Sequence, residues 1–216
     1  MRFRDRNEAG RLLAARLVEY ANQPGTLVLA LPRGGVPVGF EVAQALNAPL
    51  DVFVVRKLGV PGQEELAMGA IASGGIRVLN HQVICALGIP EADIEKAATI
   101  EQRELCRREQ QYRGEREPAA VSDCGVILVD DGVATGSTMR AAIAALRQRQ
   151  PLRIVVAVPV AALSTWRELE QKADAAVCLS TPERFSAVGQ WYDDFRQVND
   201  EQVRAWLQRA AQRRGF

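Results

Sequence analysis

Two adjacent carboxylates, Asp130 and Asp131, follow directly on the apolar run of residues 126–129. A short, continuous apolar run with β-branched residues is typical of a buried strand. In an open parallel sheet, ligands bind beyond the carboxyl ends of the strands, which is where these two acids fall. Carboxylate oxygens accept hydrogen bonds from hydroxyl groups but repel a phosphate group that comes too close. The pair therefore predicts a site for the hydroxyl groups of a ligand.

A loop of small and hydroxylated residues follows the two acids. Gly132 and Gly136 allow the backbone to approach a ligand, and Thr135, Ser137 and Thr138 add hydroxyl groups. The loop leads into a helical pattern, and the free N–H groups and dipole at the start of a helix favour an anion. We therefore expect the loop to hold a phosphate, and a sugar phosphate would suit both the acids and the loop.

Three other kinds of site use similar residues. A lone Asp-Asp pair at a strand end can be a helix N-cap beside a solvated neighbour, but the glycines and hydroxyl groups that follow argue against that interpretation. A nucleotide P-loop requires GxxxxGK[ST], and no lysine occurs between Lys96 and Lys172. The acidic pair of a response regulator would stand near the start of its domain, whereas this pair follows several predicted strands and helices.

The stretch VILVDDGVATGST resembles the signature with which type I phosphoribosyltransferases bind phosphoribosyl pyrophosphate (PRPP): an apolar strand, two acids, a variable stretch and TGST. The resemblance implies that Asp130 and Asp131 hold the 2- and 3-hydroxyls of the ribose. It also implies that the following loop wraps the 5-phosphate, through Val133, Ala134, Thr135, Gly136, Ser137 and Thr138. The whole chain is similar to a group of phosphoribosyltransferase-domain proteins that share FRDR, LPRGGVPVG, VRKLGVPG and GxWYxDF.

A second glycine turn, in ALPRGGVPVG, offers a site for the pyrophosphate of PRPP. Arg33 supplies a permanent charge, Gly34 and Gly35 let main-chain N–H groups approach the ligand, and a helix is expected to begin near Val36. A dinucleotide-binding turn or a plain tight turn is the alternative, although no acid ends the second strand to bind a ribose. The turn resembles the pyrophosphate loop of the family, which implies a cis peptide bond between Pro32 and Arg33.

Two basic residues, Arg56 and Lys57, end the next predicted strand. They resemble the basic pair with which adenine- and orotate-type relatives begin a flexible catalytic loop, and that resemblance implies a catalytic role. Residues 56–75 contain five glycines, which favours a mobile loop that closes over the substrate and leads into a short hairpin around residues 70–79. Two bases at a strand end are also common as plain surface residues.

The segment FSAVGQWYDDFRQV concentrates aromatic residues near the C-terminus. It distantly resembles the C-terminal segment of hypoxanthine-guanine enzymes, which implies that Phe185 stacks on a flat acceptor with Trp191 or Tyr192 nearby. The same aromatics could instead belong to the core. The chain departs from those enzymes because it has no lysine placed to read a purine 6-oxo group, so the resemblance does not specify the acceptor.

These candidate residues require a scaffold of alternating strands and helices. Strands are predicted at residues 26–31, 50–55, 125–129, 152–158 and 175–179, and helices at 7–23, 36–46, 91–114, 138–149, 161–172 and 200–213. Continuous apolar strands separated by helices indicate a parallel sheet covered on both faces. The predicted fold class is α/β, a doubly wound and mostly parallel sheet. We expect one domain over residues 1–216, with a core at about 7–179 and a hood and C-terminal helix at about 180–216.

Composition excludes some classes of protein. The 216 residues include 27 basic and 26 acidic side chains, a balance that gives no support to nucleic-acid binding. No apolar run approaches the ~20 residues that a membrane-spanning helix needs. A charged, amphipathic N-terminus is unlike a signal peptide, so the expected location is the cytoplasm.

Together these patterns predict a Mg²⁺-dependent enzyme that transfers the phosphoribosyl group of PRPP to a nitrogenous acceptor and releases pyrophosphate. The Mg²⁺ is expected near Asp130 and Asp131, bound by PRPP oxygens and water with few direct protein ligands. The alternative is a regulator that binds PRPP without transferring it. The partners expected are PRPP and a small-molecule acceptor, with no nucleic acid and no membrane. The family resemblance implies a homodimer.

Overall fold

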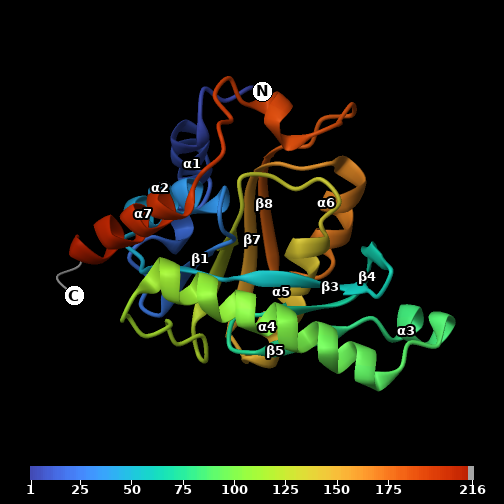
Figure 1. Cartoon of the computed structure of the whole chain (residues 1–216). Coiled ribbons are helices and arrows are strands. Elements are labelled where there is room, and N and C mark those ends of the chain that lie inside the picture. The colour runs from blue at the N-terminus through green and yellow to red at the C-terminus, as the bar shows by residue number, and fades with distance from the viewer. Residues whose placement is uncertain (214–216) are drawn as a thin grey trace.

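The computed structural model describes residues 1–213 and is built around a five-stranded sheet (Figure 1). The strands are β1 (Thr26–Ala30), β2 (Leu50–Val52), β6 (Gly125–Val129), β7 (Arg153–Val160) and β8 (Ala175–Ser180). They run parallel in the order β2-β1-β6-β7-β8. All carboxyl ends of these strands therefore meet at one edge of the sheet, and the loops that follow β1 and β6 are neighbours.

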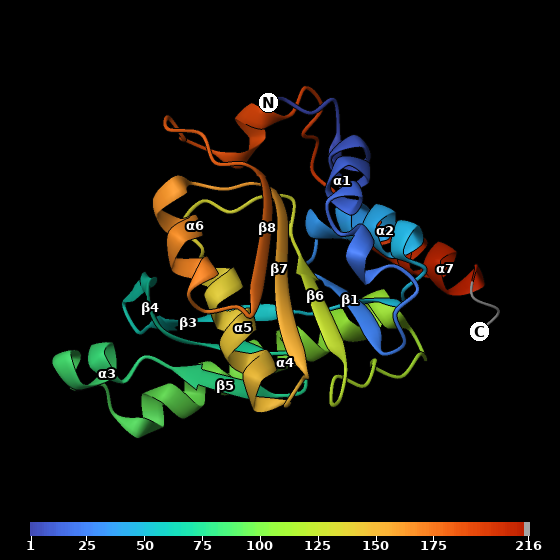
Figure 2. The same ribbon diagram turned by 180° about the vertical axis from the view of Figure 1, so that it is seen from behind.

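Helices cover both faces of this sheet, as Figure 2 shows. Alternate residues of β1 point to opposite sides: Leu27 and Leu29 pack with residues of α5 (Ser137–Gln148) and α6 (Leu163–Glu170), whereas Val28 packs with residues of α1 (Arg6–Ala15) and α2 (Gly35–Leu46). Because both faces are covered, β1, β6 and β7 are almost wholly buried, whereas the edge strand β8 is partly buried. The predicted α/β fold with a doubly wound parallel sheet is confirmed.

A smaller antiparallel sheet lies beside the large one. It consists of β3 (Val55–Val60), β4 (Gln63–Ala72) and β5 (Ile76–Leu79), followed by α3 (His81–Leu87) and α4 (Glu91–Arg113). Residues of β3, β4 and α4 share one apolar cluster, and α5 lies against the same small sheet. The predicted strand over residues 50–55 is split, because β2 belongs to the large sheet and β3 to the small one.

The prediction of a mobile loop over residues 56–75 is wrong, because most of this segment forms the β3–β4 ribbon. Two of its glycines, Gly59 and Gly69, allow neighbouring strands to pack closely. A Cβ atom on Gly59 would lie 2.8 Å from the carbonyl oxygen of Glu64, and one on Gly69 would lie 2.6 Å from that of Val78. Gly62, at φ +77°, forms the turn between the two strands. Glycines that allow strands to approach and glycines that loosen a loop look alike in composition.

The C-terminal part forms a hood over the carboxyl edge of the large sheet. It comprises residues 181–199 with the 3₁₀ helix η2 (Val188–Trp191), and it leads into α7 (Asp200–Gln212). The N-terminal segment pairs with the hood: the N–H of Phe3 donates to the carbonyl of Trp191 at 2.8 Å, and the N–H of Asp193 donates to that of Phe3 at 2.8 Å. The two segments lie side by side in Figures 1 and 2.

Two further features complete the described part of the chain. A short 3₁₀ helix, η1 (Val18–Tyr20), follows α1 inside the segment predicted as one helix, so that helix is shorter than expected. None of the helices within residues 1–213 is both long enough and apolar enough to cross a membrane.

Candidate functional site

Asp130 and Asp131 stand at the carboxyl end of β6, directly beside the turn that follows β1. The contact between the two loops is very close: a Cβ atom on Gly34 would lie 2.0 Å from Oδ2 of Asp131, and one on Gly35 would lie 2.8 Å from the carbonyl oxygen of Val129. No side chain fits at either glycine. The structure therefore joins the two predicted ligand loops into a single site.

Arg33 lies at the mouth of this site. Its peptide bond with Pro32 is cis, as the family resemblance implied. The guanidinium Nη1 lies 3.7 Å from Oδ1 of Asp200 at the start of α7, and the hydroxyl of Tyr112 donates to the same oxygen at 3.0 Å. Burial, followed by that hydrogen bond, raises the pKa of Tyr112 to about 12. Because the Arg33 side chain is 36% exposed and only loosely paired, it is free to contact an anion.

Hydrogen bonds hold the loop after the acids in place, and several of its residues are exposed to solvent. Val133 donates its N–H to the carbonyl of Val160 at 2.9 Å, and the hydroxyl of Thr165 donates to the carbonyl of Ala134 at 2.7 Å. Gly136 has φ +73°, and a Cβ atom there would lie 2.4 Å from Cγ2 of Thr165. The exposed residues of the loop are Ala134, Thr135, Ser137 and Thr138. The loop thus has the form of an anion cradle at the start of α5.

Burial governs the electrostatics of the acidic pair. It raises the pKa of Asp130 well above the ordinary value, and the neighbouring charge of Asp131 raises it further. The pKa of Asp131 is also raised by burial, while the charge of Arg6, whose Nε lies 2.7 Å from Oδ2, works in the opposite direction. Two carboxylates with one cation carry a net negative charge, which suits hydroxyl donors and a positively charged reaction centre.

Sequence reasoning missed two residues that contact Asp131. The guanidinium of Arg6 pairs with its carboxylate, and the hydroxyl of Tyr192 donates to its main-chain carbonyl at 2.5 Å. Arg6 comes from the first turn of α1 and Tyr192 from the hood, so neither is near the acids in the chain. Arg6 lies in the FRDR pattern and Tyr192 in the GxWYxDF pattern, but no local spacing connects either pattern to the acidic pair.

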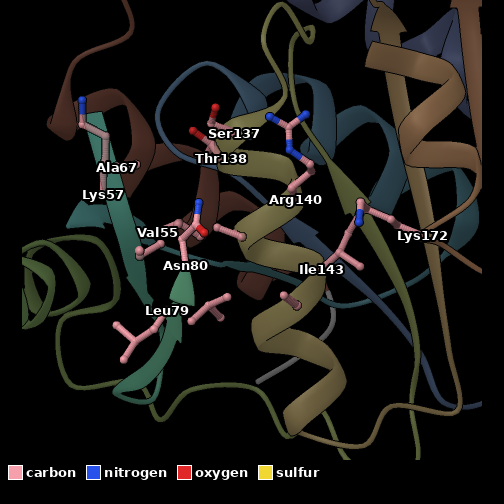
Figure 3. Close-up of a pocket in the computed structure, with 15 residues that line it drawn as sticks. Val55, Lys57, Ala67, Leu79, Asn80, Ser137, Thr138, Arg140, Ile143 and Lys172 are labelled. Atoms are coloured by element: carbon pink, nitrogen blue, oxygen red, sulfur yellow. The ribbon is translucent and has the colours of Figure 1, made fainter. Parts of the chain in front are cut away.

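The β3 strand places Arg56 and Lys57 in different surroundings. Arg56 pairs with Glu101 of α4, with Nε and Oε2 2.6 Å apart. Lys57 lines a cavity of about 540 Å³ between the small sheet and α5, and Ser137 and Thr138 line the same cavity (Figure 3). Lys57 thus shares this cavity with two residues of the predicted cradle, and it also lines a second cavity together with Arg56.

Phe185 and Trp191, the predicted acceptor residues, are partly buried against an apolar cluster formed by Phe3, Ala9, Val160 and Tyr192. The indole N–H of Trp191 is buried and has no hydrogen-bond partner among the residues that the structure describes. The hood reaches the site through Val188, whose Cγ1 would lie 2.5 Å from a Cβ atom on Gly132. Both aromatics thus belong to a hood that contacts the loop immediately after the acids.

Within residues 1–213 no three His, Cys, Asp or Glu residues lie close enough together to hold a metal ion. Asp130 and Asp131 are the acids at the site, and Arg6 already engages one oxygen of Asp131. Such a donor set fits a Mg²⁺ ion that takes most of its ligands from a bound substrate and water.

A parallel sheet of this order, with an acidic pair, a hydroxyl-rich cradle and a second glycine turn at its carboxyl edge, places the chain in the type I phosphoribosyltransferase class. Residues 5–195 match the family model described as the phosphoribosyl transferase domain. The chain belongs to this family.

Two curated proteins of Mycobacterium tuberculosis, from strains H37Rv and CDC 1551, carry provisional phosphoribosyl transferase names. Each is 45% identical over 208 residues, which is 96% of this chain and 47% of the relative. The chain thus spans about half the length of these relatives.

Two solved structures are also similar. The crystal structure of TT1426 from Thermus thermophilus is 45% identical, covers 96% of this chain and 98% of its own, and has a TM-score of 0.86. The purine phosphoribosyltransferase of Pyrococcus horikoshii is 16% identical, with coverage of 90% and 92% and a TM-score of 0.50, and it shows the shared fold.

Proposed function

We propose that the chain transfers the 5-phosphoribosyl group of PRPP to a nitrogenous acceptor and releases pyrophosphate, in a reaction that requires Mg²⁺. One observation carries the proposal: the turn of Gly34 and Gly35 packs directly on Asp130 and Asp131, which in turn lead into the cradle. A single ligand with hydroxyl groups between a phosphate and a second anionic group matches that order of parts.

The chemistry of the acids, the loop and the Arg33 turn assigns one part of PRPP to each of them. The ribose hydroxyls donate to the carboxylates of Asp130 and Asp131. The 5-phosphate accepts hydrogen bonds from the N–H groups and hydroxyls of residues 133–138 at the start of α5. The pyrophosphate lies at the Arg33 turn, where the exposed guanidinium supplies positive charge.

The reaction is a displacement at C1 of the ribose. The bond from C1 to the pyrophosphate oxygen breaks, pyrophosphate takes the electron pair, and the acceptor nitrogen forms the new bond to C1 and loses a proton. Positive charge that develops on the ribose is stabilised by the net negative charge of the acidic pair. Asp130 is suited to take the proton, because burial raises its pKa well above the ordinary value of a carboxyl group.

The leaving group is highly charged, and several groups share that charge. A Mg²⁺ ion held near Asp130 and Asp131 would neutralise part of it. Arg33 in the turn after β1 and Lys57 on β3 supply further positive charge. Arg56 contributes only after it leaves Glu101, with which it forms an ion pair of 2.6 Å.

The acceptor is assigned to the space beneath the hood. Phe185 offers a flat apolar surface, and Trp191 offers an N–H group that lacks a partner within the described residues. A planar heterocycle with a nitrogen nucleophile and a hydrogen-bond acceptor fits these two groups. Assembly of the chain as a homodimer is part of the same proposal.

The direct test is turnover. Protein, Mg²⁺ and PRPP are incubated with a panel of purine, pyrimidine and other nitrogen heterocycles, and pyrophosphate release is measured. The Asp130→Asn/Asp131→Asn variant should release none, whereas Asp123→Asn, an exposed acid just before β6, should behave as the wild type. Binding of PRPP without turnover for any acceptor would favour the regulator, and absence of binding would refute both.

A further inference from the structure

We propose that Arg6 is a positioning residue that fixes the carboxylate of Asp131 in the orientation that accepts a ribose hydroxyl. The inference rests on the proposed function, because it assigns a role within the same ribose site. It gives the N-terminal segment a part in substrate binding, although that segment contributes no group to the ligand itself.

The guanidinium of Arg6 is held on several sides. Its Nε lies 2.7 Å from Oδ2 of Asp131, and its Nη1 donates to the main-chain carbonyl of Arg196 at 2.9 Å. Its Cζ lies 3.9 Å from the ring centroid of Phe195, a distance typical of a cation–π contact. Arg6 is 9% exposed. An arginine confined in this way presents one fixed donor to the carboxylate.

Asp131 is confined just as closely. On one side Oδ2 meets Arg6, and a Cβ atom on Gly34 would lie 2.0 Å from the same oxygen. On the main chain, its carbonyl accepts the hydroxyl of Tyr192 at 2.5 Å. No hydrogen bond from the described residues reaches Oδ1, which is also not among their buried unpaired atoms. Oδ1 is therefore the oxygen that remains open to a ligand hydroxyl.

Arg6 also balances charge at the site. It forms the one ion pair of the acidic pair among the described residues. The groups that face Asp131 are Asp130, Arg6 and the Tyr192 hydroxyl, and burial disfavours the charged form of both acids. Without Arg6, Asp131 would lose the partner that favours its charged form and fixes its orientation.

A purely structural ion pair is the competing explanation, and two ligands separate it from positioning. Inorganic phosphate can bind at the cradle or at the Arg33 turn without contacting the acids, whereas ribose 5-phosphate uses the cradle and the acids. If Arg6 orients Asp131 towards a ribose hydroxyl, replacing Arg6 should weaken the binding of ribose 5-phosphate and leave the binding of phosphate unchanged. A general loosening of the fold would weaken both.

The experiment titrates both ligands into the wild type, Arg6→Met, Arg6→Lys and Arg113→Met, with binding followed by calorimetry or by nuclear magnetic resonance. Arg113, the last residue of α4, is the matched control. Its ion pair with Asp51 is similarly buried and does not include Asp131. We expect Arg6→Met to weaken ribose 5-phosphate about tenfold or more and to leave phosphate unchanged. Arg6→Lys should recover most of the affinity, and Arg113→Met should leave both affinities unchanged.

Equal affinities of the wild type and Arg6→Met for ribose 5-phosphate would overturn the inference, as would an equal loss for both ligands. If Arg6→Met does not fold, Arg6→Lys decides. A lysine cannot reach both Asp131 and the carbonyl of Arg196, so a loss of about threefold confined to ribose 5-phosphate is expected, and no loss refutes the role. A wild type that binds phosphate but not ribose 5-phosphate would refute the proposed function itself.

Discussion

The Cα of Gly34 lies directly against the carboxylate of Asp131, so closely that a methyl group on Gly34 would stand 2.0 Å from Oδ2. This contact joins the turn after β1 to the acids after β6. It also limits what the turn can carry, because any side chain at Gly34 would push Asp131 away from its position beside Arg6.

Gly34→Ala tests this contact. Gly34 has φ −63° and ψ −32°, which alanine adopts without strain, so the expected effect is steric. We expect PRPP affinity to fall at least about tenfold and the free energy of unfolding to fall by about 1–3 kcal/mol. Gly125→Ala is the control, because its added Cβ would first meet the flexible end of Arg153 at 3.1 Å. Calorimetric titration of Gly34→Ala with unchanged PRPP affinity would contradict the assignment.

The two acids should respond to substitution with opposite changes in stability. Burial and the charge of Asp131 raise the folded-state pKa of Asp130 above the unfolded value of about 3.9. Between these two pKa values the folded protein binds more protons, so its stability falls as the pH rises through the folded pKa. Asp130→Asn removes that loss and should therefore raise the free energy of unfolding at pH 8.

Asp131→Asn instead leaves Arg6 buried without its carboxylate, and it should cost about 3 kcal/mol. Urea unfolding at pH 5 and pH 8 measures both variants. The pH dependence assigned to Asp130 should be absent in Asp130→Asn. Destabilisation of similar size by both substitutions would show that the charges are not arranged as described.

Lys57→Met and Arg56→Met separate the two basic residues of β3. Lys57 lines the cavity that Ser137 and Thr138 also line, and its Nζ makes two long contacts with the exposed Glu65, at 3.3 Å to the carbonyl and 3.5 Å to the carboxylate. Arg56 is occupied by Glu101. We expect Lys57→Met to lower kcat/KM for PRPP about tenfold, and Arg56→Met to have a smaller effect. Pyrophosphate-release kinetics measure both, and a larger loss for Arg56→Met would reverse the assignment.

Tyr192→Phe tests how the hood holds Asp131. The Tyr192 side chain is 2% exposed, and its hydroxyl donates to the main-chain carbonyl of Asp131 at 2.5 Å. Removal of the hydroxyl leaves that carbonyl without its donor, so the free energy of unfolding should fall by about 1–2 kcal/mol. Ribose 5-phosphate affinity should fall with it, whereas inorganic phosphate should bind as before. Unchanged stability in urea would argue against the hydrogen bond.

Local patterns in the sequence were enough to predict the scaffold and the position of the loop that follows the acids. The strand predicted at residues 125–129 is β6, and the acids, glycines and hydroxyls that follow it are contiguous, so their arrangement is set by one strand and one helix start. The carboxyl edge of a parallel sheet then brings the Arg33 turn next to them. Each of these steps depends on short-range pattern and on the general rule for parallel sheets.

Contacts between distant segments could not be predicted in the same way. Arg6 and Tyr192 reach Asp131 because the N-terminal segment pairs with the hood, and that pairing has no periodic signature. The β3–β4 ribbon was also missed. Its glycines resembled a flexible loop, and only the positions of the neighbouring strands reveal that Gly59 and Gly69 allow close packing.

Binding of PRPP is the measurement that tests the account most directly. Calorimetric titration of PRPP in the presence of Mg²⁺ should show saturable binding to the wild type and to Asp123→Asn. Asp130→Asn, which is expected to remain folded and to be more stable at pH 8, should lose about tenfold or more in affinity, because one acceptor of the ribose hydroxyls is weakened. A wild-type protein that does not bind PRPP, or an Asp130→Asn variant that binds it equally well, would contradict the account.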